Sequence, residues 1–205
     1  MLLVSNLCSM RNQTPVFESL NFEVPLGQSL LLIGPNGCGK TTLLRLLAGS
    51  GIPDGGVIHW CGKPIRKDPN FLSILAYLGH LDGLKGSLTV AENISFARIL
   101  ANKGLPSKQK MQSWLNSVGL NHAELLSKPC QKLSAGQKRR VSLACVLAKE
   151  ATLWLLDEPT VALDDHAQKC FEACVREHLR HKGCVVMSSH HPFLADQTLN
   201  LGRRP

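Results

Sequence analysis

Short apolar segments and longer amphipathic segments alternate along the chain. The apolar segments have the length of β-strands and lie at 2–7, 20–24, 29–33, 57–60, 74–78, 153–156 and 185–188. Helical periodicity is clearest at 40–48, 90–101, 107–118, 135–148 and 165–180. The runs at 30–33 and 153–156 are apolar without alternation, which is typical of strands buried on both faces of a parallel sheet. The pattern predicts an α/β fold with a mostly parallel core sheet flanked by helices.

Strands and helices alternate at both ends of the chain, whereas its middle is mostly helical. We therefore expect one domain over 1–205. It has a core at about 1–78 and 150–205 and a helical subdomain at about 79–149. Gly49 follows the first predicted helix, where a left-handed residue is expected to end it.

Composition narrows the class of protein. Hydrophobic residues make up 44% and charged residues 19% of the 205 positions, which indicates an ordinary globular chain and argues against disorder.

Since no apolar run approaches the ~20 residues of a membrane-spanning helix, we expect no such helix. The first ten residues, MLLVSNLCSM, lack the basic start and long apolar core of a signal peptide, which predicts that the chain is not secreted. The eight cysteines include no CxxC pair and are expected to be reduced thiols.

A glycine-rich phosphate-binding motif lies between the third predicted strand and the first predicted helix. The sequence GPNGCGKT matches GxxxxGK[ST], and a strand before it and a helix after it favour a phosphate site over an unliganded turn. Backbone N–H groups of such a loop face a phosphate chain, the lysine adds charge for the β- and γ-phosphates, and the Thr41 hydroxyl can bind Mg²⁺. The candidate ATP-binding residues here are Gly34, Pro35, Asn36, Gly37, Cys38, Gly39, Lys40, Thr41 and Thr42.

Two acidic residues follow the apolar run LWLL at 153–156. Asp157 and Glu158 stand at the carboxyl end of a predicted parallel strand, which faces the ligand crevice in such folds. We expect Asp157 to hold Mg²⁺ through water and Glu158 to polarise the attacking water. The alternative is that both acids only cap the turn at Pro159 and Thr160, and the phosphate-binding motif weighs against it.

The segment LSAGQKRR at 133–140 opens a predicted helix and resembles the LSGGQ signature of ABC-type ATPases. Ser134 and Gln137 also fit a helix capping box, and both interpretations can hold. The resemblance implies a P-loop NTPase of ABC-ATPase type, with an N-terminal antiparallel β part and a RecA-like core. It further implies that Ser134, Gly136 and Gln137 meet the γ-phosphate bound by a second subunit, in a head-to-tail dimer enclosing two ATP.

Further segments resemble the same family. VALD at 161–164 is similar to the D-loop, and His190, after the strand at 185–188, is similar to the switch histidine that contacts the γ-phosphate. Two positions differ from the family. Arg11, 29 residues before Lys40, stands where an aromatic residue usually stacks on adenine, and a guanidinium can stack there too. His80 stands where the Q-loop glutamine is expected, and its protonation depends on pH.

The run YLGHLDGLK at 77–85, with LSAGQKRRVSLA and LWLLDEP, is similar to the ATP-binding subunits of the cytochrome c maturation system, the haem exporter. This resemblance implies membrane-spanning partners bound through about 78–130, at the cytoplasmic face of the bacterial inner membrane. ATP turnover would drive haem export or release of a haem-loaded chaperone. An ABC transporter with another cargo is the alternative.

The net charge of +8 raises a third possibility, a soluble ABC ATPase that acts on nucleic acid. Against it, the chain holds one short cassette, and the basic clusters at 138–140 and 203–204 are too small to form an obvious track. We therefore expect no nucleic-acid partner.

Overall fold

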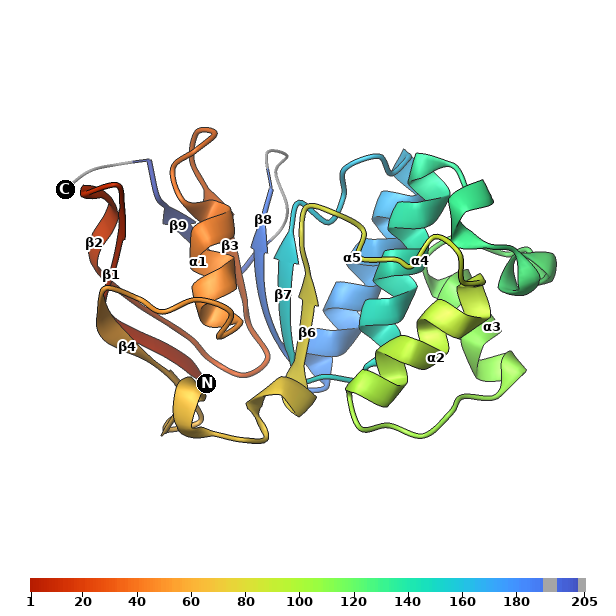
Figure 1. Cartoon of the computed structure of the whole chain (residues 1–205), viewed down its shortest axis with the longest axis horizontal. Coiled ribbons are helices and arrows are strands. Elements are labelled where there is room, and N and C mark those ends of the chain that lie inside the picture. The colour runs from red at the N-terminus through yellow and green to blue at the C-terminus, as the bar shows by residue number, and fades with distance from the viewer. Residues whose placement is uncertain (190–194, 203–205) are drawn as a thin grey trace.

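The computed structural model describes residues 1–189 and 195–202, which form two sheets and five α-helices (Figure 1). The predicted switch histidine, His190, and the basic pair at 203–204 lie outside these residues. The first sheet is antiparallel, in the order β2-β1-β4-β5. Its strands are β1 (Leu2–Arg11), β2 (Thr14–Val24), β4 (Gly55–Trp60) and β5 (Lys63–Pro64).

The second sheet is parallel throughout, in the order β6-β7-β8-β3-β9. Every residue of β7 and β8 is buried, as the unbroken apolar run at 153–156 predicted. Its strands are β3 (Ser29–Ile33), β6 (Leu75–Leu78), β7 (Leu153–Asp157), β8 (Cys184–Ser188) and β9 (Gln197–Asn200). The predicted mostly parallel core sheet is confirmed.

Helices cover both faces of the parallel sheet. Helix α1 (Lys40–Leu47) packs in one apolar core between this sheet and the antiparallel sheet. Helices α4 (Ala135–Ala148) and α5 (Asp165–Arg180) pack in a second core on the opposite face, with α2 (Val90–Leu100) and α3 (Lys108–Ser117) outside them. Short 3₁₀ turns occupy Ile65–Lys67, Phe71–Ile74, Ala123–Ser127 and Cys130–Lys132.

Local signals fix where the helices begin and end. Thr89 caps α2 in a capping box with Glu92, and Ser107 caps α3. Gly49 has a φ of 73°, and its N–H donates to the Leu46 carbonyl at 3.0 Å, which confirms the predicted left-handed residue after α1. In the described part of the chain, none of the helices has the length and apolar character needed to cross a bilayer.

Because the second sheet is parallel, the carboxyl ends of its strands meet at one edge. The phosphate-binding motif follows β3 at this edge, Asp157 ends β7, and Ser188 ends β8. Residues that are more than a hundred positions apart in sequence are thus brought together, which is where ligands bind in open α/β sheets.

Candidate functional site

The loop between β3 and α1 is shaped by two glycines that no other residue could replace without strain. Gly34 and Gly39 have φ angles of 143° and 106°, in the region that L side chains rarely adopt. A Cβ at Gly34 would lie 2.7 Å from Cys38 Sγ, and one at Gly39 would lie 2.5 Å from Val16 Cγ1. The motif therefore encodes the backbone path itself, which is the path of a phosphate-binding loop.

Lys40 begins α1 and is almost buried, with 7% of its surface exposed. Its Nζ donates to the carbonyl oxygens of Gly34 at 2.8 Å and Pro35 at 3.1 Å. These two bonds fix the Lys40 ammonium group against the backbone of the loop. A cation placed against backbone dipoles at a helix N-terminus makes a site for a phosphate chain.

Asp157 links the loop to the next strands of the sheet. Its Oδ2 accepts from Thr41 Oγ1 at 2.6 Å, and its Oδ1 accepts from Ser188 Oγ at 2.6 Å. The carboxyl group is 2% exposed. Hydroxyl and carboxylate oxygens are the donors that Mg²⁺ prefers, so Thr41 and Asp157 fit the predicted ion. Among residues 1–189 and 195–202, no group of three or more His, Cys, Asp or Glu side chains could hold a metal ion.

Glu158 follows Asp157 in a left-handed backbone conformation, with a φ of 49°. Its N–H is shared between the carbonyl oxygen and the Oγ of Ser188, at 3.2 and 3.0 Å. These bonds join the end of β7 to the end of β8. Asp157 thus contacts the phosphate-binding loop through Thr41, and Glu158 follows it at the carboxyl edge of the sheet.

Arg11 shares a cleft with the phosphate-binding loop. The cleft has a volume of about 430 Å³ and opens between the start of β2 and the loop. It is lined by Arg11, Thr14, Pro15, Val16, Pro35, Asn36, Gly37, Cys38, Leu201 and Gly202. The structure thus places the exposed Arg11 in one cleft with the phosphate-binding loop.

The predicted signature segment lies on the other side of the sheet. Ser134 Oγ accepts from the Gln137 N–H at 3.2 Å, and Gln137 Oε1 accepts from the Ser134 N–H at 3.1 Å, so the predicted capping box exists. A Cβ at Gly136 would lie 2.9 Å from the Ala162 carbonyl, which shows that this segment packs on the predicted D-loop. Since α4 and α1 cover opposite faces of the parallel sheet (Figure 1), one chain does not bring the signature segment to its own phosphate-binding loop.

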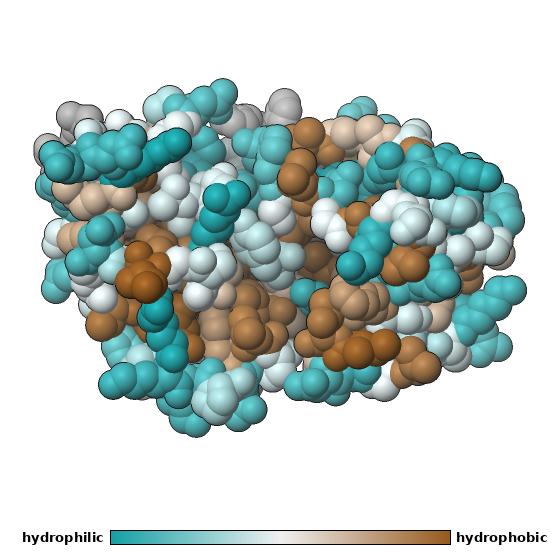
Figure 2. Space-filling view, viewed as in Figure 1, coloured by the Kyte–Doolittle hydropathy of each residue, from teal (hydrophilic) through white to brown (hydrophobic). Residues whose placement is uncertain are grey.

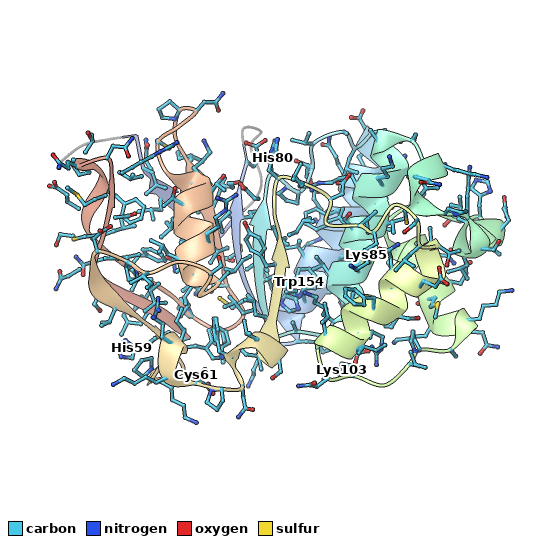
Figure 3. All side chains as sticks on the ribbon, viewed as in Figure 1. His59, Cys61, His80, Lys85, Lys103 and Trp154 are labelled. Atoms are coloured by element: carbon cyan, nitrogen blue, oxygen red, sulfur yellow. The ribbon has the colours of Figure 1, made fainter. Side chains whose placement is uncertain are left out.

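His80 follows β6, and Figure 3 places it near the carboxyl ends of the central strands. The side chain is exposed. The carbonyl of the preceding Gly79 accepts from Arg139 Nη1 at 3.1 Å. The segment at the Q-loop position is therefore connected to α4.

Two site residues escaped the sequence analysis. Arg139 was considered there only as part of the basic cluster at 138–140; it is 4% exposed and donates to the Asp157 and Glu158 carbonyls at 2.8 and 2.7 Å. Helical spacing held the signal, because Arg139 stands four positions before the buried Leu143. Ser188 was seen only as a neighbour of the switch histidine.

Comparisons with known proteins agree with this geometry. The sequence model of the ABC transporter family matches residues 17–161. The cytochrome c biogenesis ATP-binding export protein CcmA of Nitrosococcus oceani is 42% identical over 191 residues, covering 93% of this chain and 86% of that protein. CcmA of Vibrio parahaemolyticus is 39% identical over 197 residues, covering 96% of this chain and 95% of that protein.

Solved structures show the same fold. An ABC transporter ATP-binding protein from Pyrococcus furiosus superposes with a TM-score of 0.86 at 29% identity, covering 98% of this chain and 96% of that one. A dimeric bacterial ABC transporter cassette reaches a TM-score of 0.85 at 22% identity, covering 98% and 95%. The chain therefore belongs to the ABC transporter family of ATPases and, within it, to the family of cytochrome c biogenesis ATP-binding export proteins.

Proposed function

We propose that this chain binds ATP with Mg²⁺ and hydrolyses it to drive an ABC transporter complex of cytochrome c biogenesis, through haem export or release of a haem-loaded chaperone. The observation that carries the proposal is the arrangement of Lys40, Thr41 and Asp157, since a buried ammonium and a hydroxyl–carboxylate pair meet at one edge of the sheet. The names of the similar proteins support the choice of process.

Each residue then has a stated role. Lys40 and the loop N–H groups bind the β- and γ-phosphates, and Arg11 stacks on the adenine. Thr41 and Asp157 hold Mg²⁺, which when bound neutralises charge on the phosphates. Glu158 orients the attacking water and accepts its proton. His190 contacts the γ-phosphate, and His80 takes the place of the Q-loop glutamine.

The complete site needs two copies of the chain. Ser134, Gly136 and Gln137 of a second copy close over the ATP bound by the first, in a head-to-tail dimer with two sites. Support comes from the separation of α4 and α1 within one chain, and from the dimer seen for a cassette of the same fold. ATP binding then closes the dimer, and hydrolysis opens it.

Membrane-spanning subunits are the partners of this dimer, and we place the chain at the cytoplasmic face of the bacterial inner membrane as a peripheral subunit. Figure 2 shows apolar surface over α2 and near the start of β6. Four large apolar side chains are exposed on the turn before β6 and on α2: Leu72 at 69%, Phe96 at 40%, Ile99 at 55% and Leu100 at 60%. Leu81, which is 82% exposed, follows the other end of β6. Such a patch is typical of an interaction surface, and cytoplasmic segments of the membrane subunits fit it.

The nucleic-acid alternative loses one of its two basic clusters. With the Arg139 guanidinium buried against backbone carbonyls, that cluster keeps Lys138 and Arg140, and Arg140 is already paired with Asp164 at 3.0 Å. Two cations on one helix do not make a track for a phosphate backbone.

The decisive experiment compares Lys40→Ala with the wild-type chain in the complex purified from detergent-solubilised membranes. We expect the variant to lose ATP binding and hydrolysis, because the ammonium that faces the phosphates is gone. Lys63→Ala, at an exposed position of β5, is the matched control and should hydrolyse ATP normally. Unchanged hydrolysis in Lys40→Ala would refute the site.

The same purified complex also tests whether the chain serves cytochrome c biogenesis. Mass spectrometry of the copurified membrane subunits and haem spectroscopy of the eluate should both be positive for wild type. A wild-type complex that hydrolyses ATP but contains no haem-handling partner would point to an ABC transporter with another cargo.

A further inference from the structure

Arg139 is a buried cation that none of the roles above uses. It lies in the second turn of α4, just after the signature segment, and its guanidinium reaches three successive carbonyl groups. Nη2 donates to the carbonyls of Asp157 at 2.8 Å and Glu158 at 2.7 Å, and Nε donates to that of Pro159 at 3.3 Å. Arg139 is therefore hydrogen-bonded to the backbone of both acids of the site, Asp157 and Glu158.

The opposite side of the same guanidinium holds the segment 79–82. Nη1 donates to the Gly79 carbonyl at 3.1 Å and lies 3.5 Å from Asp82 Oδ1. One turn further along α4, Ser142 Oγ donates to the Asp82 carbonyl at 2.8 Å. Two side chains of α4 thus fix both ends of this segment, between which His80 and Leu81 stay exposed.

The backbone of Glu158 needs such support. A left-handed φ of 49° strains a non-glycine residue, and it persists only where neighbouring groups hold it. Ser188 holds the N–H of Glu158 and Arg139 holds its carbonyl. The direction of the Glu158 side chain therefore depends on where the Arg139 guanidinium lies.

We propose that Arg139 is a positioning residue that couples the segment 79–82 to the backbone of Glu158. A membrane subunit that docks on this segment thereby determines how the water-orienting carboxylate of Glu158 is oriented. The inference rests on the proposed function, since it assigns the route between the partner surface and the hydrolytic site. The exposed Leu81 contacts the partner. Because Gly79 and Asp82 both contact Arg139, a shift of this segment moves the Arg139 guanidinium.

An arginine is needed for this role because the contacts diverge. A guanidinium presents five N–H donors in a rigid fork, and here three nitrogens reach four carbonyls and one carboxylate. A lysine keeps the positive charge but offers three donors from a single nitrogen, which cannot span both segments. Replacing Arg139 by lysine therefore keeps the positive charge and removes the hydrogen-bonding geometry.

The test is Arg139→Lys in the purified complex, with ATP affinity, KM and kcat measured below the melting temperature of each variant. We expect kcat to fall by about 100-fold, as for a reacting group moved by roughly 1 Å, while ATP affinity and KM stay unchanged. A purely structural role would not separate kcat from KM in this way.

Arg98→Lys is the matched control. Arg98 is another mostly buried arginine that donates to two carbonyls, of Gly104 at 2.8 Å and Ala148 at 2.9 Å, and pairs with Glu150 at 3.3 Å. These contacts lie within the helical subdomain, away from Glu158. Both variants should melt at lower temperature than wild type, but only Arg139→Lys should lose kcat.

A second variant decides the matter if Arg139→Lys does not fold. Asp82→Asn removes the charged partner of Arg139 and leaves the four carbonyl contacts, so we expect a smaller fall in kcat at unchanged KM. Normal kcat in folded Arg139→Lys, or in Asp82→Asn where Arg139→Lys does not fold, overturns the inference. A wild-type complex without ATPase activity would instead overturn the proposed function.

Discussion

Asp157 uses its side chain and its backbone for different tasks. The carboxylate accepts two hydrogen bonds of 2.6 Å, from Thr41 and Ser188, while its carbonyl accepts from Arg139. Hydrogen bonds to a charged group contribute about 1.5–3 kcal/mol, so the carboxylate is fixed in direction before any ligand enters. Under the proposed function, Thr41 and Asp157 would offer a Mg²⁺ ion oxygen ligands that already lie close together.

Glu158→Gln separates ATP binding from hydrolysis. The amide keeps the size of the side chain but cannot accept a proton from water, so we expect ATP binding to remain and hydrolysis to stall. The measurement is steady-state phosphate release, together with the amount of ATP retained by the protein. Glu172→Gln, at a partly exposed position on α5 that pairs with Arg176, is the control and should behave as wild type. Normal turnover in Glu158→Gln would exclude this residue as the water-orienting group.

Arg11→Ala tests the base end of the cleft. If the guanidinium stacks on adenine, its removal should weaken ATP binding by about 1 kcal/mol, the size of an exposed cation–π contact. Isothermal titration with ATP measures the change. Inorganic triphosphate, which has no base, should bind wild type and variant equally. Equal ATP affinity in the two proteins would remove Arg11 from the adenine site.

At the scale of elements, α5 is joined to β7 by a stacked pair. The rings of Trp154 and His178 lie 3.9 Å apart at 9°, and His178 Nε2 lies 3.1 Å from the Thr152 carbonyl. Trp154, marked in Figure 3, belongs to the core beneath the helices. Burial lowers the pKa of His178 to about 4, so this histidine is neutral in the folded chain at neutral pH.

This pKa predicts how stability changes with acid. Between pH 6.5 and about 4 the unfolded chain takes a proton on His178 before the folded chain does, so the stability present above pH 6.5 is lost as pH falls. His178→Phe keeps the stacked ring but has no such proton. The difference in Tm between wild type and variant should therefore shift in favour of the variant from pH 7 to pH 4.5. A difference that stays constant over this range would contradict the neutral, buried state of His178.

The sequence predicted correctly the strands whose signal lies in a few neighbouring residues, and it missed those whose form depends on pairing with distant strands. Strands β3 and β7 were predicted because their unbroken apolar runs carry the signal locally. Strand β9 was missed because QTLN is short, has three polar residues out of four, and pairs only with β3. The start of β2 was missed because three register shifts interrupt its pairing with β1, so no simple alternation remains.

The candidate site divides in the same way. The phosphate-binding loop and the two acids occupy contiguous motifs, and the structure brings them together as predicted. Arg139 was missed because its partners lie 18 to 60 positions away along the chain, at the ends of β6 and β7. Helical spacing to Leu143 indicates the inward face of the helix, but only the folded sheet shows which carbonyls the Arg139 guanidinium meets.

At the scale of the whole molecule, the parallel sheet separates two halves of one reaction site. The phosphate-binding loop opens helix α1 on one face, and the signature segment opens α4 on the other. Both helix N-termini favour anions, but only a second copy can bring one to the other. Under the proposed function, closure around ATP is therefore a property of two chains.

The dimer is tested by placing a large side chain where the second copy should close. In the Glu158→Gln background we expect ATP to produce a dimer, and adding Ser134→Arg should abolish it while each chain still binds ATP. Light scattering with and without ATP measures the mass. Replacing the N-cap serine also costs about 1 kcal/mol of stability, so Ser107→Arg, at the N-cap of α3, is the matched control. The control should lose similar stability and still dimerise, because α3 takes no part in the proposed interface. A dimer that survives Ser134→Arg would show that the signature segment does not meet ATP across the interface.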